Sequence, residues 1–172
     1  MNEPTLPPEE YTERLAREIG ALFLNFSGVE HGLALTIAAA MDLTDAQERA
    51  LVRGMMPRAK VEWLQGFSKR FWNAEYQARF KVLATAAIEV AEFRNNIAHG
   101  LIVHNQAGEW HTISFRGQHR FGGDVQKLTP QEVGRHVQMA MDTGFALHQF
   151  SVDVTEGKAK ATSPPAPPAD AR

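Results

Sequence analysis

The first hundred residues alternate apolar and polar positions with the period of an α-helix. Apolar residues from Leu15 to Ala40 recur at three- and four-residue steps, which predicts one long helix from about residue 9 to residue 41. A second apolar stripe predicts another long helix from about residue 74 to residue 98. Helices therefore dominate the predicted structure.

Between these two helices, local signals mark shorter elements. Thr44 followed by Gln47 is a capping-box pattern, which predicts the start of a second helix. Pro57 is expected to end or kink that helix, because proline lacks the backbone N–H and clashes with the preceding turn. A third helical element is then expected to run to about residue 70.

After the second long helix, the period changes to that of a β-strand. Residues 101–115 alternate in the manner of a β-hairpin, with Ala107 and Gly108 as the turn. A third short strand is expected within residues 119–126.

The predicted fold is a mainly α-helical bundle of four to five helices, with a small β-hairpin before the last helix. That helix should begin at a capping-box pattern in residues 129–132 and run to about residue 153. A chain of 172 residues has room for one core. We expect one domain over residues 9–155, a flexible N-terminus over residues 1–8, and a disordered Pro/Ala-rich tail over residues 156–172.

Composition excludes several classes of protein. The chain has no cysteine, so neither a disulfide framework nor a thiolate metal site is expected. Its first ten residues show no basic leader and no apolar signal core, and its longest apolar stretch, LALTIAAAM, is shorter than the roughly 18 to 20 residues of a membrane span. We therefore expect a cytoplasmic protein with no membrane partner.

The net charge of -2 conceals a basic central segment. Residues 53–81 carry seven Lys and Arg against two Glu, whereas residues 1–50 carry three Lys and Arg against nine Asp and Glu. Aromatic residues are interleaved with these cations, among them Trp63, Phe67, Phe71, Trp72 and Tyr76. The segment is either a surface for a polyanion or a solvated helix face whose aromatic residues lie in the core.

Polar residues gather at the end of the second long helix, in the stretch AEFRNNIAHG. On a helical wheel with Phe80 at the centre of the apolar stripe, Arg94 lies at about -40° and points along the stripe, toward the core. Asn95 lies on the other side of the stripe, and His99 lies one turn beyond it, at the stripe's edge. An inward guanidinium is unfavourable unless it is paired or lines a cavity.

The long first helix offers a partner for this arginine. Glu30 lies at the margin of that helix's apolar stripe, about 60° from its centre. In a structural interpretation, Arg94 and Glu30 form a buried salt bridge, and His99 caps a helix C-terminus, where a cation is favoured. In a functional interpretation, the same residues belong to a site.

The stretch FRNNIAHG resembles the signature of the HEPN superfamily (higher eukaryotes and prokaryotes nucleotide-binding domains). That signature is an arginine, usually followed by a polar residue, and then a histidine after four to six intervening positions near the end of a core helix. Here four residues separate Arg94 from His99, and the polar residue is Asn95. The long first helix with Glu30 extends the resemblance, in outline, to roughly residues 10–155.

The resemblance implies a helical bundle that forms a homodimer and brings two such motifs together at the subunit interface. Many members are metal-independent endoribonucleases, and others are non-catalytic modules that bind nucleotide, RNA or a partner protein. By this resemblance His99 would match the catalytic histidine and Arg94 the arginine. Asn95 would match the polar orienting residue, and Glu30 an acidic position of the first helix.

The chemistry that the resemblance implies requires no metal and no other cofactor. RNA carries its own nucleophile in the 2′-hydroxyl, so cleavage of single-stranded RNA requires proton transfer and charge stabilisation. A histidine titrates near neutral pH, and an arginine can bind phosphorane oxygens through two hydrogen bonds.

One position departs from the pattern of a toxin branch of the superfamily. In the branch that pairs with a small nucleotidyltransferase antitoxin, a tyrosine two places after the histidine receives nucleotidyl groups. Here that position is Leu101, so control by tyrosine modification is not expected. A role in defence, with an antitoxin-like protein as partner, is an expectation that comes from the superfamily alone.

The hairpin contains two histidines that raise the question of a metal. If residues 107–108 form a two-residue turn, His104 and His111 lie opposite each other on one face. A third ligand could then come from Glu109, His119 or Asp124. No motif spacing supports a metal site, so we interpret both histidines as surface residues.

The predicted first helix also has a second face of small and apolar residues: Ala21, Gly28, Gly32, Leu35 and Ala39. Such a face permits the close approach of another helix. It fits either packing within the chain or a dimer interface.

Overall fold

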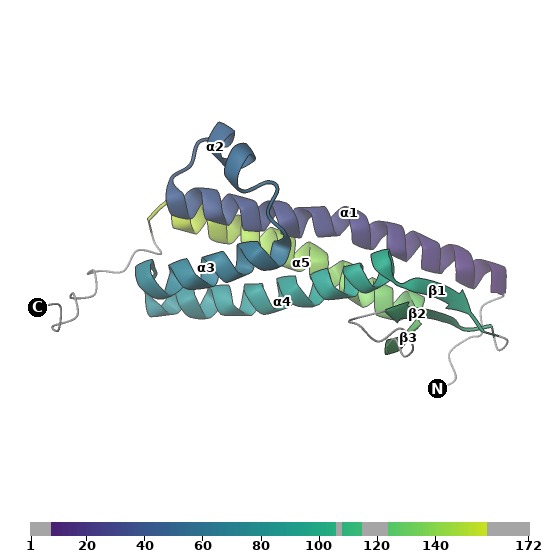
Figure 1. Ribbon diagram of the computed structural model, residues 1–172. Helices are drawn as coiled ribbons and strands as arrows, with labels where there is room; N and C mark the ends of the chain where they lie inside the picture. Colours follow the sequence, from purple (N-terminus) through teal and green to yellow (C-terminus); the bar gives the residue numbers. More distant parts are fainter. Residues whose placement is uncertain (1–7, 106–107, 115–123, 158–172) are drawn as a thin grey trace, which may run out of the picture.

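The protein is a bundle of helices with a small antiparallel sheet at one end (Figure 1). This computed structural model describes residues 8–105, 108–114 and 124–157. Its elements in chain order are α1 (Pro8–Met41), α2 (Asp45–Leu51), α3 (Pro57–Phe71), α4 (Ala74–His99), β1 (Leu101–His104), β2 (Trp110–Ser114), β3 (Asp124–Leu128) and α5 (Pro130–Thr155). The prediction of a mainly α-helical protein with a small β-structure before the last helix is confirmed.

Helices α1 and α5 run in the same direction and pack against each other along their lengths. Gly134, near the start of α5, faces Glu18 of α1, and Leu147, farther along α5, lies beside Gly32. A Cβ atom at Gly32 would lie 2.7 Å from the Cβ of Leu147, so glycine is needed there for this close approach. Gly32 of the small-residue face of α1 therefore packs within the chain, whereas Gly28 of the same face is exposed.

Helix α4 runs opposite to α5 and is only partly covered by α3. Arg79 near the start of α4 pairs with Asp153 near the end of α5, whereas Glu89 pairs with Arg135 near its start. Helix α3 has 15 residues and α4 has 26. The C-terminal half of α4 therefore extends beyond the start of α3 (Figure 1).

Local capping explains where two of the helices begin, and it corrects one prediction. Thr44 and Gln47 form the predicted capping box: the Thr44 N–H donates to Gln47 Oε1 at 2.9 Å, and the Gln47 N–H donates to Thr44 Oγ1 at 3.4 Å. The expectation that Pro57 ends the second helix is wrong, because α2 ends at Leu51. Pro57 is instead the first residue of α3, where a missing N–H costs nothing.

The hairpin forms as predicted, but its register differs by one residue. The Asn105 N–H donates to the Glu109 carbonyl at 2.9 Å, so three residues rather than two lie between the paired positions. His104 consequently pairs with Trp110, and His111 pairs with Val103. Because a shift of one residue moves a side chain to the other face, the expectation that the two histidines lie opposite each other is wrong.

The third strand and the two ends of the chain complete the comparison with the predicted elements. β3 spans Asp124–Leu128 and pairs with β2, so it overlaps the predicted segment 119–126, of which residues 119–123 lie outside the described residues. Most of the predicted flexible N-terminus and the predicted tail also lie outside the described residues, which begin at residue 8 and end at residue 157.

Helix α1 is a long apolar helix of the bundle. Over Glu9–Met41 it is long enough, and within one stretch of 18 residues apolar enough, to suit a membrane span. A core helix of a folded protein can have the same length and composition. Several of its apolar residues are indeed buried in the core: Leu15, Leu22, Phe26, Val29, Leu33 and Ile37.

Candidate functional site

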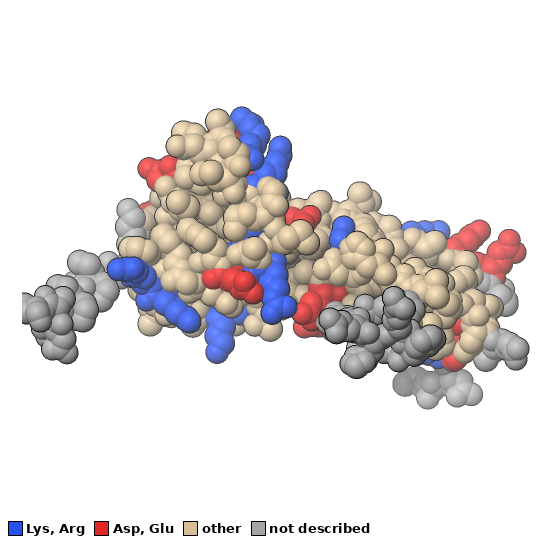
Figure 2. Space-filling view, in the orientation of Figure 1, with Lys and Arg blue, Asp and Glu red and all other residues tan. Residues whose placement is uncertain are grey.

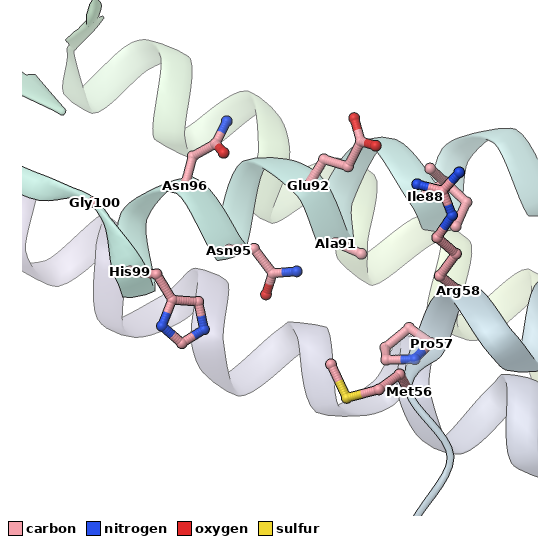
Figure 3. A pocket seen from close by; sticks show the side chains of 10 residues that line it. All are labelled: Met56, Pro57, Arg58, Ile88, Ala91, Glu92, Asn95, Asn96, His99 and Gly100. Atoms are coloured by element: carbon pink, nitrogen blue, oxygen red, sulfur yellow. The ribbon is translucent and has the colours of Figure 1, made fainter. Parts of the chain in front are cut away.

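A pocket of about 340 Å³ lies where α3 begins, against the C-terminal half of α4 (Figure 3). Helix α4 provides most of its lining, and the start of α3 closes the other side. The lining residues are Met56, Pro57, Arg58, Ile88, Ala91, Glu92, Asn95, Asn96, His99 and Gly100. Two of the predicted site residues, Asn95 and His99, share this pocket because they lie one helical turn apart.

Arg94 packs against α1, as the helical wheel predicts, and a hydrogen bond connects it to the pocket. Its guanidinium carbon lies 4.9 Å from the ring centre of Phe23 and 5.4 Å from that of Phe26. Its Nη1 donates to Oδ1 of Asn95 at 3.0 Å. Arg94, Asn95 and His99 therefore form one cluster, which we call the Arg94–His99 cluster.

Among the described residues, the guanidinium of Arg94 has no carboxylate partner of the kind that a structural arginine would have. No ion pair joins Arg94 to any Asp or Glu in the described part of the chain. Its Nε atom is buried and has no hydrogen-bond partner among the described residues. The expected buried salt bridge between Arg94 and Glu30 is therefore wrong, and the inward arginine still needs an explanation.

Glu30 lies instead beside a buried lysine of α3. Lys60 is only 3% exposed, and its Nζ donates to the backbone carbonyl of Glu30 at 3.4 Å. Burial lowers the pKa of Lys60, and the nearby carboxylates of Glu30 and Glu48 oppose that shift. These three residues line a second pocket of about 250 Å³ with Ser27, His31, Ala34 and Arg53. The structure thus separates Glu30 from the Arg94–His99 cluster.

The end of α4 is fixed by the strand next to it. The Gly100 N–H donates to the carbonyl of Asn96, which also accepts a hydrogen bond from Thr112 Oγ1 at 3.0 Å. A Cβ atom at Gly100 would collide with both of these oxygens, so glycine is required after His99. His99 itself is exposed in the last turn of the helix, where a cation is favoured by the helix dipole.

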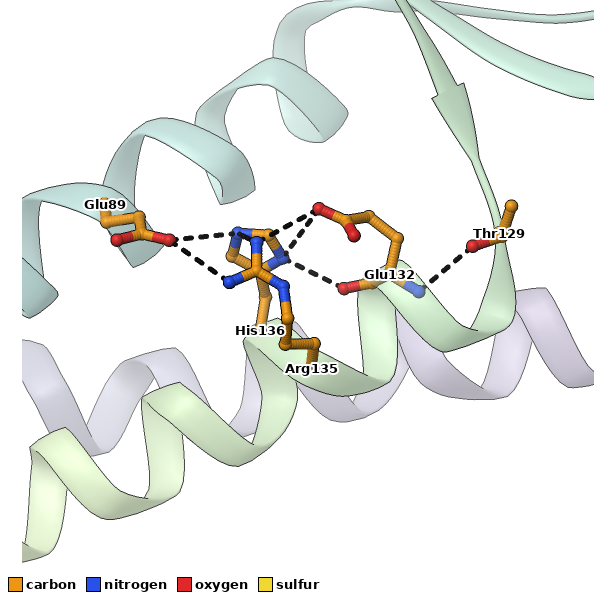
Figure 4. Close-up of polar contacts among 5 residues, drawn as sticks. All are labelled: Glu89, Thr129, Glu132, Arg135 and His136. Atoms are coloured by element: carbon orange, nitrogen blue, oxygen red, sulfur yellow. Dashed lines mark hydrogen bonds and ion pairs between the residues drawn. The ribbon is translucent and has the colours of Figure 1, made fainter.

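A second polar cluster lies on the other side of α4, around His136 of α5 (Figure 4). The His136 ring stacks on Phe93 with 3.5 Å between the ring centres and 2° between their planes. Its Nδ1 lies 2.9 Å from the Glu132 carbonyl, which can only accept, so Nδ1 carries the proton. Its Nε2 then accepts from Arg135 Nη2 at 3.2 Å. Both ring nitrogens are satisfied and the ring is buried, so this histidine is structural.

This histidine clamp fixes the part of α4 that precedes the site. Phe93 is the residue before Arg94, and its ring is held between α4 and α5 by the stack on His136. The surrounding ion pairs, from Arg135 to Glu89 and Glu132, are half exposed. The clamp therefore stabilises the helix on which the Arg94–His99 cluster lies.

The aromatic residues of the basic central segment differ in burial: Trp63 and Phe67 are partly buried against the core, and Phe71 is half exposed. Trp72 and Tyr76 are buried, and Lys60 is the one cation of the segment that is also buried. The other six cations are exposed, and Figure 2 shows Lys and Arg concentrated on the part of this face formed by α2, α3 and the start of α4. The packing of Trp72 and Tyr76 supports the interpretation in which the cations lie on a solvated helix face and the aromatic residues lie in the core.

The described residues of the hairpin do not assemble into a metal site, and His119, one of the candidate ligands, lies outside the described residues. In the described ranges, no three His, Cys, Asp or Glu side chains lie together so that they could hold a metal ion. The Glu109 carboxylate instead accepts from Lys127 and from the Asn105 side chain, and these contacts lower its pKa. His104 packs beside Trp110, with 4.9 Å between the ring centres.

Sequence reasoning missed the residues that α3 and α1 bring to the site. Arg58 lines the pocket from the start of α3, and Phe23 and Phe26 lie under Arg94. The signal for Arg58 was its position just after Pro57, the first residue of a helix. The signal for the two phenylalanines was their place on the predicted first helix, one turn (Phe26) and two turns (Phe23) before Glu30.

Comparison of the chain with protein-family models, with curated proteins and with solved structures finds no match. The functional assignment therefore depends on the geometry of the Arg94–His99 cluster and on the short motif that contains it.

Proposed function

We propose that this protein is a HEPN-like, metal-independent endoribonuclease that cleaves single-stranded RNA at a site completed by a homodimer. The observation that carries the proposal is the guanidinium of Arg94 beside a pocket that contains His99: among the described residues it has no carboxylate partner, and its buried Nε has no hydrogen-bond partner. A buried polar group without a protein partner is unfavourable, and such groups are retained where a ligand supplies the partner.

A second arginine on the same helix shows what a structural arginine looks like in this protein. The guanidinium of Arg79 lies 4.9 Å from the ring centre of Tyr76 and 5.5 Å from that of Phe150, nearly the same aromatic setting as Arg94. It also pairs with Asp153 Oδ2 at 3.0 Å, which raises the pKa of Arg79. Arg94 has the aromatic rings without the acid, so a phosphate can take the acid's place.

The proposed reaction needs one base, one acid and a cation. The 2′-hydroxyl oxygen attacks the adjacent phosphorus, so that the O2′–P bond forms and the P–O5′ bond breaks. One imidazole accepts the 2′-hydroxyl proton, and another donates a proton to the departing 5′ oxygen. In a homodimer the two copies of His99 fill these roles. Arg94 stabilises the charge on the phosphorane oxygens, and Asn95 holds its guanidinium in place.

The homodimer in this proposal is supported by the surface around the pocket. Met56 lines the pocket and is exposed, and Leu101, just after the pocket residue Gly100, is exposed as well. Contiguous exposed apolar patches mark interaction surfaces, and in the proposed homodimer these two side chains belong to such a patch. A second copy of the chain seated there would bring a second His99 to the site.

The test is cleavage of a single-stranded RNA by purified wild-type protein and by His99→Ala. His148→Ala is the matched control, because His148 is an exposed histidine on α5 that does not line the pocket. Loss of a general acid or base lowers the rate by about 10² to 10⁴. We expect that loss for His99→Ala, wild-type activity for His148→Ala and unchanged circular dichroism for both.

Two further readouts identify the chemistry. Cleavage should persist in EDTA, and the products should carry 2′,3′-cyclic phosphate ends, because the neighbouring hydroxyl is the nucleophile. If wild-type protein cuts no RNA with or without metal, or if His99→Ala cuts as well as wild type, the nuclease assignment fails. A non-catalytic module that binds nucleotide, RNA or a partner protein then becomes the better assignment for the same pocket.

A further inference from the structure

The pocket that contains His99 also contains an arginine from a different helix. Arg58 is the second residue of α3, and it lines the pocket opposite the C-terminal half of α4. Figure 3 shows Arg58 near Ile88 and Glu92, at the far end of the pocket from His99. Nothing in the Arg94–His99 cluster explains a cation at this place.

The side chain of Arg58 is available to a ligand. Its Nε pairs with Glu62 Oε1 at 3.1 Å, one turn along α3, and both side chains are largely exposed, at 74% and 64%. An exposed pair of this kind contributes about 0 to 1 kcal/mol, so a ligand can displace it. The two Nη groups of Arg58 form no hydrogen bond with the described residues, and they have the geometry to bind two phosphate oxygens.

The length of the pocket separates Arg58 from the proposed reaction centre. Its lining on α4 runs from Ile88 to His99, and eleven residues of α-helix span about 16 Å. Arg58 and His99 lie at opposite ends of the pocket, so they cannot contact the same phosphate. Between them lie Ala91 and Pro57, which offer an apolar floor for a sugar or a base.

We propose that Arg58 binds a second backbone phosphate of the same RNA strand, away from the bond that is cut, and so sets a minimum length for the substrate. This inference rests on the proposed function for its substrate class. Glu92, the one carboxylate in the lining, opposes a phosphate in the same pocket. Arg58 is thus a positioning residue that acts on binding, not on bond cleavage.

The first experiment compares substrates that have and lack the second phosphate. Arg58→Gln and wild type are assayed on a dinucleoside monophosphate, whose single phosphate is the one cut, and on a tetranucleotide. A hydrogen-bonded contact to a charged group corresponds to about 10- to 100-fold in kcat/KM. We expect that loss for the tetranucleotide and no change for the dinucleotide. Arg70→Gln, an exposed arginine near the end of α3, is the matched control for net charge.

The second experiment measures binding without cleavage. A 2′-O-methyl RNA has no free nucleophile, so its affinity can be measured at several salt concentrations. Each phosphate contact with a single strand contributes about 0.7 to the slope of log K against log salt. Arg58→Gln should reduce the slope by about that amount and Arg70→Gln should not, whereas Glu92→Gln should tighten binding.

The outcomes separate this inference from the proposed function. If wild type cuts RNA and Arg58→Gln matches Arg70→Gln on both substrates and in the salt slope, the second phosphate site is overturned and the nuclease stands. If wild type cuts nothing but Arg58→Gln reduces the slope, the phosphate site stands and the nuclease fails. If wild type cuts no RNA and does not bind the uncleavable RNA, both are overturned.

Discussion

Replacement of Arg94 by methionine tests whether this arginine serves the fold or a ligand. Arg94→Met keeps an unbranched apolar side chain on the rings of Phe23 and Phe26 and removes only the guanidinium. Two cation–π contacts are lost, at about 0.5 to 1 kcal/mol each for a partly exposed site. The hydrogen bond to Asn95 is also lost, at about 1 kcal/mol.

Against these losses, the substitution removes a buried N–H group that has no partner. The unsatisfied Nε of Arg94 costs about 1 to 3 kcal/mol in the folded state. The opposing contributions nearly cancel, so the free energy of unfolding should change by no more than about 1 to 2 kcal/mol. A buried Arg94–Glu30 salt bridge would have predicted a loss of about 3 to 5 kcal/mol, because Glu30 would be left unpaired.

Arg79→Met is the matched control, since Arg79 lies over two aromatic rings in the same way. It also leaves Asp153 without its guanidinium, and the side chain of Asp153 is only 13% exposed. Loss of this ion pair should lower the free energy of unfolding further. The decrease should lie between that for an exposed ion pair, about 0 to 1 kcal/mol, and that for a buried one, about 3 to 5 kcal/mol. Arg79→Met should therefore be clearly less stable than Arg94→Met.

The assay is urea unfolding of the three proteins, followed by circular dichroism, together with binding of a 2′-O-methyl RNA. We expect Arg94→Met to unfold at nearly the same urea concentration as wild type and to lose affinity for RNA. Arg79→Met should unfold at a lower urea concentration and keep its affinity for RNA. A loss of stability above about 3 kcal/mol in Arg94→Met would refute the reasoning, because it would show that the guanidinium holds the fold together. Unchanged RNA affinity in a stable Arg94→Met would refute the proposed role of the arginine.

Three other predictions follow from the packing, the buried lysine and the proposed assembly. Gly32→Ala should lower the melting temperature, because the cost of overpacking, about 1 to 3 kcal/mol, outweighs the gain in helix propensity, about 1 kcal/mol. Gly20→Ala should raise the melting temperature, because open space surrounds Gly20 and only the gain in helix propensity applies. Burial lowers the pKa of Lys60, so the folded state loses this proton at a lower pH than the unfolded state does. Wild type should therefore gain stability relative to Lys60→Met as the pH rises toward 10.5. Equal pH dependence of stability in urea unfolding of the two proteins would contradict this prediction. Light scattering at micromolar concentration should give the mass of a dimer, and a monomer under those conditions would exclude the composite site.

The helices could be predicted from the sequence because their signals are local. The apolar period defines α1 and α4, and the capping pattern at Thr44 places the start of α2 to the residue. Pro57 shows the limit of such signals, because a proline is compatible both with the end of one helix and with the start of the next. The hairpin register shows the same limit, since one additional residue in the turn moves every side chain of the strand to the other face.

The candidate site could be predicted only as far as it lies on one helix. Arg94, Asn95 and His99 are related by the helical period alone, so their mutual positions follow from the sequence. The partner of Glu30 depends on how α1, α2 and α3 are rotated about their axes, which a wheel drawn for one helix does not contain. The sequence did not place Arg58 in the pocket for the same reason. The position of the start of α3 against α4 is set by the packing of the two helices, which neither helix determines alone.

The parts of the fold that hold α4 explain how an unpaired arginine can be kept beside the pocket. The Phe93–His136 stack fixes the turn just before Arg94, and the hydrogen bond from Thr112 to Asn96 fixes the turn after it. Of these residues only Asn96 lines the pocket, and it accepts this hydrogen bond through its backbone carbonyl, so the contacts stabilise the helix whether or not a ligand is bound. Arg94 can therefore keep its position without a carboxylate. A phosphate that binds there meets a guanidinium already in place, and little conformational entropy is lost on binding.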